Sequence, residues 1–145
     1  MKSQLTTLPL ASNELEAVAR QLQMAELTLP FWGYRKPMPI HRIVRLEGEG
    51  NYTHFYFNDG TKLIVSLTLK RIESRLPANV FARSHKKNLI NLLYLREVRS
   101  KRHPFMVGLS NGDYVEVSRR KAAQFYRQIE TFQQQMNLLR NVPVA

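Results

Sequence analysis

Clusters of arginine and lysine are the side chains of this sequence with the clearest chemistry, because they bind phosphate. The chain has 22 Lys+Arg against 11 Asp+Glu, a formal net charge of +11, and residues 35–121 contain 18 of these bases and 7 of these acids. The whole charge excess therefore lies in one stretch, and the two ends are neutral. This distribution favours a module that faces a polyanion such as nucleic acid.

The first cluster lies in the segment 81–91, where donor-rich polar residues precede an apolar pair. Cations in this segment would neutralise phosphates, and Lys and Asn side chains also have the groups that read guanine and adenine edges. The candidate contacts are Arg83, His85, Lys86, Lys87 and Asn88. The alternative is a solvated basic turn that leads into a strand, because charge runs are often only solvated.

The second cluster follows a strand-like segment and opens the last expected helix. Ser118 at the N-cap would leave backbone N–H groups facing an anion. Arg119 and Arg120 beside it suit a phosphate or a guanine. Basic side chains are slightly unfavourable at the positive end of a helix, so an external anion helps to explain them. The alternative is a helix start with exposed charges.

The third basic segment, 96–104, lies between two expected strands. It would hold the phosphate backbone without reading sequence. Its candidate contacts are Arg96, Arg99, Lys101 and Arg102. A solvated hairpin tip is the alternative.

The segment 47–53 contains two glycines and two acids but no Gly-Lys-Ser/Thr, so it is not a phosphate cradle. It predicts a turn, from which Asn51, Tyr52 or Thr53 would face a groove. The aromatic residues that follow, within 52–57, have the composition of a base-stacking platform for single strands. Such a run also fits a half-buried strand, which is the more common outcome.

Catalysis and metal binding have no matching motif. The four histidines are scattered, none forms an H-x-x-x-H pair, and Cys is absent. We therefore expect no enzyme, no cofactor and no metal. Neither a signal peptide nor a membrane-spanning run is present, so the expectation is a cytoplasmic protein without a membrane partner.

A mainly β arrangement must position the clusters. Aromatic and β-branched segments predict strands over 40–46, 52–57, 62–65, 105–109 and 114–117, with hairpin turns at 58–60 and 110–113. Ser66 is expected to cap a short internal helix that buries Leu69, Ile72 and Leu76 and ends at Pro77.

The two ends predict flanking helices. An N-terminal helix is expected over 12–26, followed by a Pro-rich linker over 30–39 that packs aromatic side chains. From Ser118, a long final helix places apolar residues at helical spacing, and the piece from Phe132 onward would extend beyond the domain towards a partner. The helix positions are Ala122, Phe125, Tyr126, Ile129, Phe132, Met136 and Leu139.

Three blocks in this order resemble the LytTR DNA-binding domain of bacterial transcription regulators. They read "LEGEGNYTHFYFNDG", "FARSHKKNLINLLYLREV" and "VEVSRRKAAQFY", with "SLTLKRIESRLP" at the place of the family's short helix. The resemblance covers about 90 residues and implies the domain limits 1–39, 40–132 and 133–145.

The resemblance implies a mainly β fold of small packed antiparallel sheets with one short internal helix, to which this chain adds flanking helices. It implies that loops enter successive major grooves of duplex DNA. The groove-facing positions would be Thr53, Lys86 and Arg119, with His85 and Arg120 beside them. It also implies a homodimer on paired short repeats.

Two departures from the family pattern bear on function. Lys87 stands where the family commonly has Ser, which raises the charge. Only 39 residues precede the module, too few for the family's usual receiver domain, so we expect constitutive activity or control by a separate signalling protein. Two alternatives remain open at this point: an RNA or single-strand binder, and a basic adaptor for an acidic protein.

Overall fold

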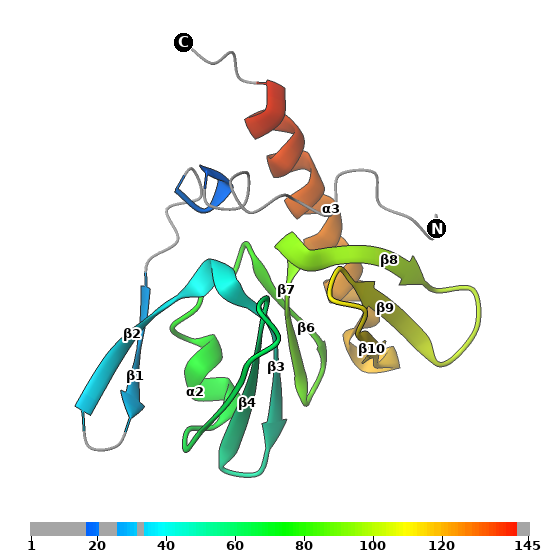
Figure 1. The fold of residues 1–145 in the computed structure, drawn as a ribbon. Helices are drawn as coiled ribbons and strands as arrows, with labels where there is room; N and C mark the ends of the chain where they lie inside the picture. Colours follow the sequence, from blue (N-terminus) through cyan, green and yellow to red (C-terminus); the bar gives the residue numbers. More distant parts are fainter. Residues whose placement is uncertain (1–16, 21–25, 32–33, 142–145) are drawn as a thin grey trace.

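Strands dominate the structure, a computed structural model that describes residues 17–20, 26–31 and 34–141. The strands form three antiparallel sheets, with the orders β1-β2, β10-β9-β8 and β5-β4-β3-β7-β6 (Figure 1). The elements are β1 (Glu26–Phe31), β2 (Tyr34–Pro39), η1 (Ile40–Arg42), β3 (Ile43–Glu49), β4 (Tyr52–Phe57), β5 (Lys62–Val65), α2 (Leu69–Glu73), β6 (Phe81–His85), β7 (Asn88–Asn91), η2 (Leu92–Tyr94), β8 (Leu95–Arg99), β9 (Phe105–Leu109), β10 (Tyr114–Val117) and α3 (Arg119–Asn141). This confirms the expected mainly β class with one short internal helix.

The five-stranded sheet follows from alternation along its strands. In β4, residues 53, 55 and 57 are buried while their neighbours are exposed or half-buried, as a strand with one face on a core requires. Gly60 has φ of 86° in the β4–β5 turn, a conformation that glycine adopts without strain. The expected hairpin at 58–60 is therefore confirmed.

The three-stranded sheet is joined to the larger sheet by side chains as well as by the chain itself. Gly112 has φ of 94° in the β9–β10 turn, which confirms the second expected hairpin. In the same turn, Asp113 pairs with Arg45 of β3 at 2.9 Å. The Tyr94 hydroxyl of η2 donates to the carbonyl of His41.

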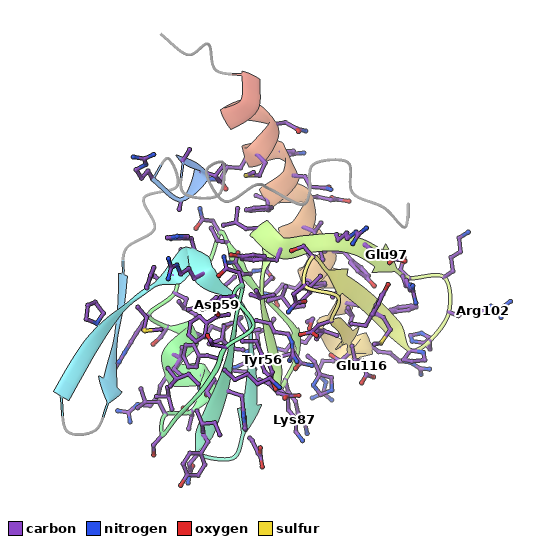
Figure 2. All side chains as sticks on the ribbon, in the orientation of Figure 1. Tyr56, Asp59, Lys87, Glu97, Arg102 and Glu116 are labelled. Atoms are coloured by element: carbon purple, nitrogen blue, oxygen red, sulfur yellow. The ribbon has the colours of Figure 1, made fainter. Side chains whose placement is uncertain are left out.

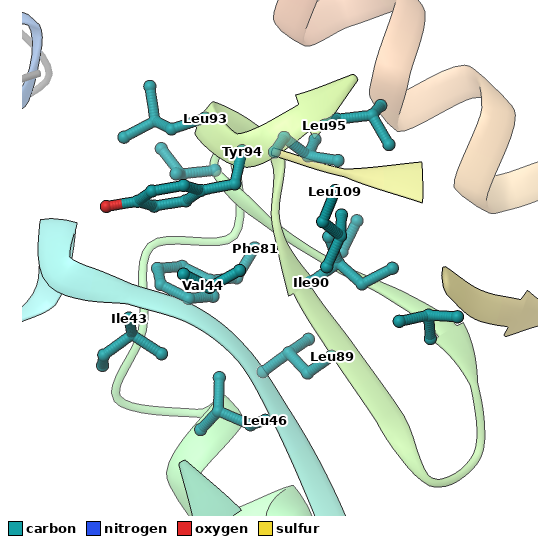
Figure 3. Packing of buried hydrophobic residues seen from close by; sticks show 14 of the residues in the cluster. Ile43, Val44, Leu46, Phe81, Leu89, Ile90, Leu93, Tyr94, Leu95 and Leu109 are labelled. Atoms are coloured by element: carbon teal, nitrogen blue, oxygen red, sulfur yellow. The ribbon is translucent and has the colours of Figure 1, made fainter. Parts of the chain in front are cut away.

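A single hydrophobic core lies between the sheets and α3. Figure 3 shows side chains of β3, β6, β7, η2 and β9 meeting there. One face of α3 completes the core, with Ala122, Phe125, Ile129, Phe132 and Met136 buried, as the helical spacing predicts. Met136 is 1% exposed, so the last helix packs on the domain at least to this residue.

The expected Pro-rich linker over 30–39 is instead most of a β-hairpin. Residues of β1 and β2 pair from Glu26↔Pro39 to Phe31↔Tyr34. The three prolines occur in alternate pairs, Glu26↔Pro39, Thr28↔Pro37 and Pro30↔Arg35. Because proline lacks an N–H, this alternation leaves the intervening pairs to form the ladder hydrogen bonds.

The start of α2 and the end of the expected N-terminal helix differ from the sequence expectation. The N-cap of α2 is Thr68, whose hydroxyl accepts from Arg71 N–H at 3.3 Å, not Ser66. Leu69, Ile72 and Leu76 are buried as expected. Residues 17–20 are helical, within the helix expected over 12–26. Glu26 belongs to β1 instead, and the remainder of that expectation lies outside the described residues.

Candidate nucleic-acid interface

Three loops from distant parts of the sequence lie next to one another. Two backbone hydrogen bonds hold them: Gly48 N–H donates to Lys87 C=O at 2.8 Å, and Ser118 N–H donates to Ser84 C=O at 2.8 Å. The first links the end of β3 to the β6–β7 turn, and the second links that hairpin to the start of α3. Figure 1 shows these ends together at the lower side of the molecule.

A β-bulge in β6 explains the second bond. The register shifts between Arg83↔Leu89 and His85↔Asn88, so Ser84 has no opposite residue in β7. A bulged residue leaves its backbone groups outside the ladder. The Ser84 carbonyl is thus available to Ser118, and this bond joins the basic segment 81–91 to the Arg119–Arg120 cluster at the start of α3.

Exposed cations line these loops. Lys86 and Lys87 form the β6–β7 turn, and Arg119 and Arg120 begin α3. Lys101 and Arg102, in the β8–β9 loop, are also exposed, and Figure 2 shows Arg102 extending from that loop and Lys87 at the lower tip. The loop connects to α3 because Arg119 Nε donates to His103 Nδ1 at 3.4 Å.

Arg83, a candidate contact, is half-buried and has two partners within the domain. Its side chain is 18% exposed and Nε lies 3.1 Å from Glu73 Oε1 of α2. Its Nη1 donates to the Lys86 carbonyl at 2.6 Å. The ion pair and the hydrogen bond tie Arg83 to α2 and to the β6–β7 turn, so its guanidinium is less available to a phosphate than the exposed Lys86 and Lys87.

His85 and Asn88 flank the same turn and are half-buried. Lys87 N–H donates to His85 Nδ1 at 3.1 Å. A nitrogen that accepts this bond carries no proton, so the proton of the neutral ring is on Nε2. His85 therefore shapes the turn and presents an N–H donor beyond it.

Arg99 is exposed but its charge is balanced locally. Its Nε lies 2.7 Å from Glu97 Oε1, and its Nη2 donates to the Tyr114 hydroxyl at 3.1 Å. The hydrogen bond from Arg99 holds the pKa of the Glu97 carboxyl below its usual value. A paired guanidinium attracts phosphate less strongly, so we expect Arg99 to be a weaker phosphate contact than the exposed Lys101 and Arg102.

Thr53, expected to face a groove, is buried instead. It is 0% exposed, and its hydroxyl donates to the Leu67 carbonyl at 2.8 Å. On β4 it shares a face with Phe55 and Phe57, which point into the core. The exposed residues at the tip of this hairpin are Glu49, Gly50, Asn51 and Tyr52, and Tyr52 is 52% exposed.

Replacing Thr53 by Val is expected to reduce the free energy of unfolding by about 0.5–1.5 kcal/mol, because it removes one buried hydrogen bond. The ratio of affinities for preferred and random duplexes should not change. Urea unfolding and binding titrations on both duplexes measure these quantities. A collapse of that ratio with unchanged stability would restore Thr53 as a base contact.

The aromatic run over 52–57 does not form an open stacking platform. Phe55 and Phe57 are buried. The guanidinium of Arg45 lies 3.7 Å above the centre of the Tyr56 ring, which covers that ring. Of this run, Tyr52 is left as an exposed aromatic side chain, and the surface offers little to a series of unpaired bases.

One polar residue of the central sequence block has a structural role that the sequence did not reveal. Asn91 is 0% exposed. Its Nδ2 donates to the Ile43 carbonyl at 2.8 Å and its Oδ1 accepts from Leu93 N–H at 3.0 Å. Asn91 thus fixes the end of β7 to β3 and caps η2, away from any surface.

A β scaffold with cationic loops on one surface has the charge pattern of a nucleic-acid-binding protein. The family model described as the LytTr DNA-binding domain matches residues 35–130, and the chain belongs to this family. DNA binding and a regulator role follow from that membership.

A solved structure supports the same fold. It is the LytTr DNA-binding domain of a putative methyl-accepting/DNA response regulator from Bacillus cereus, similar with a TM-score of 0.62 and 23% identity over 72% of this chain and 96% of that chain. The comparison with curated proteins gave no match.

Two features are absent from the described residues. None of their helices is long and apolar enough to cross a membrane. Their His, Asp and Glu side chains form no group of three that could hold a metal ion.

Proposed function

We propose that this protein is a bacterial transcriptional regulator that binds duplex DNA sequence-specifically, with its loops in successive major grooves. The observation that carries this proposal is the junction of the Lys86–Lys87 turn with the Arg119–Arg120 helix start through the Ser118–Ser84 backbone bond. Cations from two sequence-distant segments thus form one surface. Binding, not catalysis, is the activity proposed.

The residues divide into two roles. Lys86 and Arg119 are the proposed base readers, because Lys and Arg recognise guanine O6 and N7, and Asn88 and the exposed Asn51 are suited to adenine. The proposed phosphate contacts are Lys87, Lys101, Arg102 and Arg120. Their exposure and flexible charged ends suit the backbone, which gives affinity and register.

We further propose that the protein acts as a homodimer on paired short repeats in the bacterial cytoplasm. A module of this size covers few base pairs, and two copies on one duplex multiply affinity and specificity. A separate signalling protein is the proposed source of regulation.

Selection of bound sites from a random duplex pool tests this function. The expected result is a pair of short repeats whose centres are separated by about one helical turn, 10–10.5 bp. A selected pool without sequence preference would contradict specific readout. A single unpaired motif would retain readout and contradict the dimer.

Competition at fixed salt separates the alternatives. Duplex DNA is expected to displace a labelled duplex better than single-stranded DNA or RNA of equal length, because Phe55 and Phe57 are buried and cannot stack on unpaired bases. Preference for single strands would favour the RNA or single-strand alternative. No binding to any nucleic acid near physiological salt would favour an adaptor for an acidic protein.

A further inference from the structure

We propose that His103 is a positioning residue that orients the Arg119 guanidinium and thereby sets the strength of base discrimination by this arginine. The inference rests on the proposed function, in which Arg119 reads a base. It adds a residue of the β8–β9 loop to the specificity of α3, although His103 itself is not proposed to contact DNA.

The contact between the two side chains is direct. Arg119 Nε donates to His103 Nδ1 at 3.4 Å. This bond uses the Nε–H and leaves the two Nη groups for a bidentate contact with guanine O6 and N7. The separation is long for an N–H···N bond, so the guanidinium can adjust when a base edge arrives.

The His103 ring is itself held by the core. It stacks on Phe105, with ring centres 3.9 Å apart and planes inclined by 22°. Phe105 is partly buried against the core and contacts Tyr126 of α3, with ring centres 6.4 Å apart. A series of packed rings therefore connects the core to the exposed arginine.

The histidine partner distinguishes Arg119 from Arg99 and Arg83, whose guanidinium groups pair with the carboxylates of Glu97 and Glu73. An arginine side chain has many rotamers, and ordering it on binding reduces affinity. A partner that holds the guanidinium before DNA arrives lowers that entropic penalty. The benefit is specific to a residue that must meet one base in one orientation, since a phosphate contact tolerates many orientations.

Two substitutions separate the roles of the histidine. His103→Phe retains a ring that can stack on Phe105 but removes the acceptor. His103→Asn places an oxygen acceptor near the position of Nδ1 but removes the ring. Arg102→Ala, in the same loop, is the matched control that removes a charge without touching Arg119.

The experiment first finds the base pair at which Arg119→Ala loses discrimination, using duplexes that vary one position at a time. At that base pair, His103→Phe is expected to reduce discrimination about two- to tenfold, the effect of one hydrogen bond. His103→Asn should retain more discrimination than His103→Phe. In an Arg119→Ala background, His103→Phe should reduce discrimination no further. Arg102→Ala should weaken preferred and random duplexes alike.

Thermal unfolding of each variant shows whether the fold persists. Equal weakening by His103→Phe on all duplexes, or the same loss of discrimination with and without Arg119, would overturn the inference and leave base reading by Arg119 intact. If Arg119→Ala discriminates between bases as well as the wild type at every position, the proposal that Arg119 reads a base is overturned instead. His103→Phe could fail to fold. In that case the inference is overturned if a folded His103→Asn discriminates between bases no better than Arg119→Ala does.

Discussion

Replacing Arg119 by Ala is expected to weaken binding to the preferred duplex by about 1–3 kcal/mol, or about 5- to 150-fold, and to relax the preference at one base pair. Arg119 is exposed at the first turn of α3, and its backbone position is fixed because the preceding Ser118 N–H bonds to Ser84. A bidentate arginine contact distinguishes guanine from the other bases by about this energy.

The measurement is a set of binding isotherms for Arg119→Ala on preferred, single-substituted and random duplexes over a range of salt concentrations. Lys101→Ala is the matched control, since it also removes one exposed positive charge. It should weaken all sequences equally and reduce the salt slope by about one. If Arg119→Ala behaves in the same way as Lys101→Ala, Arg119 contacts only phosphate.

Replacing Asn91 by Ala is expected to lower the free energy of unfolding by about 2–4 kcal/mol, because two buried backbone groups lose their partners. These groups are the Ile43 carbonyl and the Leu93 N–H, both bound by the Asn91 side chain. The residue lies at 0% exposure, where water cannot replace either bond. A loss of this size is a large part of a typical domain's stability.

Urea unfolding measures this change, and Asn88→Ala on the same strand is the control. Asn88 is half-buried, and its substitution should change the free energy of unfolding by less than about 0.5 kcal/mol. A similar value for Asn91→Ala would show that its two hydrogen bonds add nothing to stability. If DNA affinity falls while stability stays at the wild-type value, Asn91 acts in binding instead.

Strand periodicity could have placed more of the site than the family resemblance did. Phe55 and Phe57 are evident core residues, and Thr53 lies on the same face at a spacing of two. The alternation of side chains along β4 thus predicts that Thr53 is buried and that Tyr52 is exposed. The family resemblance selected Thr53 by its place in a motif. The alternation of side chains along the strand decides that the Thr53 side chain points into the core.

The β1–β2 hairpin also left a signal in the sequence. Prolines usually indicate a loop, which led to the expected linker over 30–39. However, Pro37 and Pro39 are two residues apart, and Pro30 pairs with Arg35 in the same alternate series. Prolines with this spacing are compatible with a two-stranded ribbon, in which each strand is an edge.

Side-chain partners across the fold could not be predicted from the sequence. The Arg83–Glu73 and Arg99–Glu97 pairs take two candidate cations out of the strongest contacts. In the first pair, Glu73 of α2 and Arg83 of β6 lie in different elements, so no local spacing encodes their contact. Charge clustering located the surface, and the pairing of side chains decided which of its cations have an acidic partner.

The bonds from Gly48 to Lys87 and from Ser118 to Ser84 have a consequence for the nucleic acid. They set the spacing of the loop tips before a target is met, so any mismatch with a straight duplex would have to be relieved by bending the DNA. Bending depends on base steps, and pyrimidine–purine steps kink most readily. Operators should therefore be enriched in such steps between the contacted positions, at base pairs that no side chain touches.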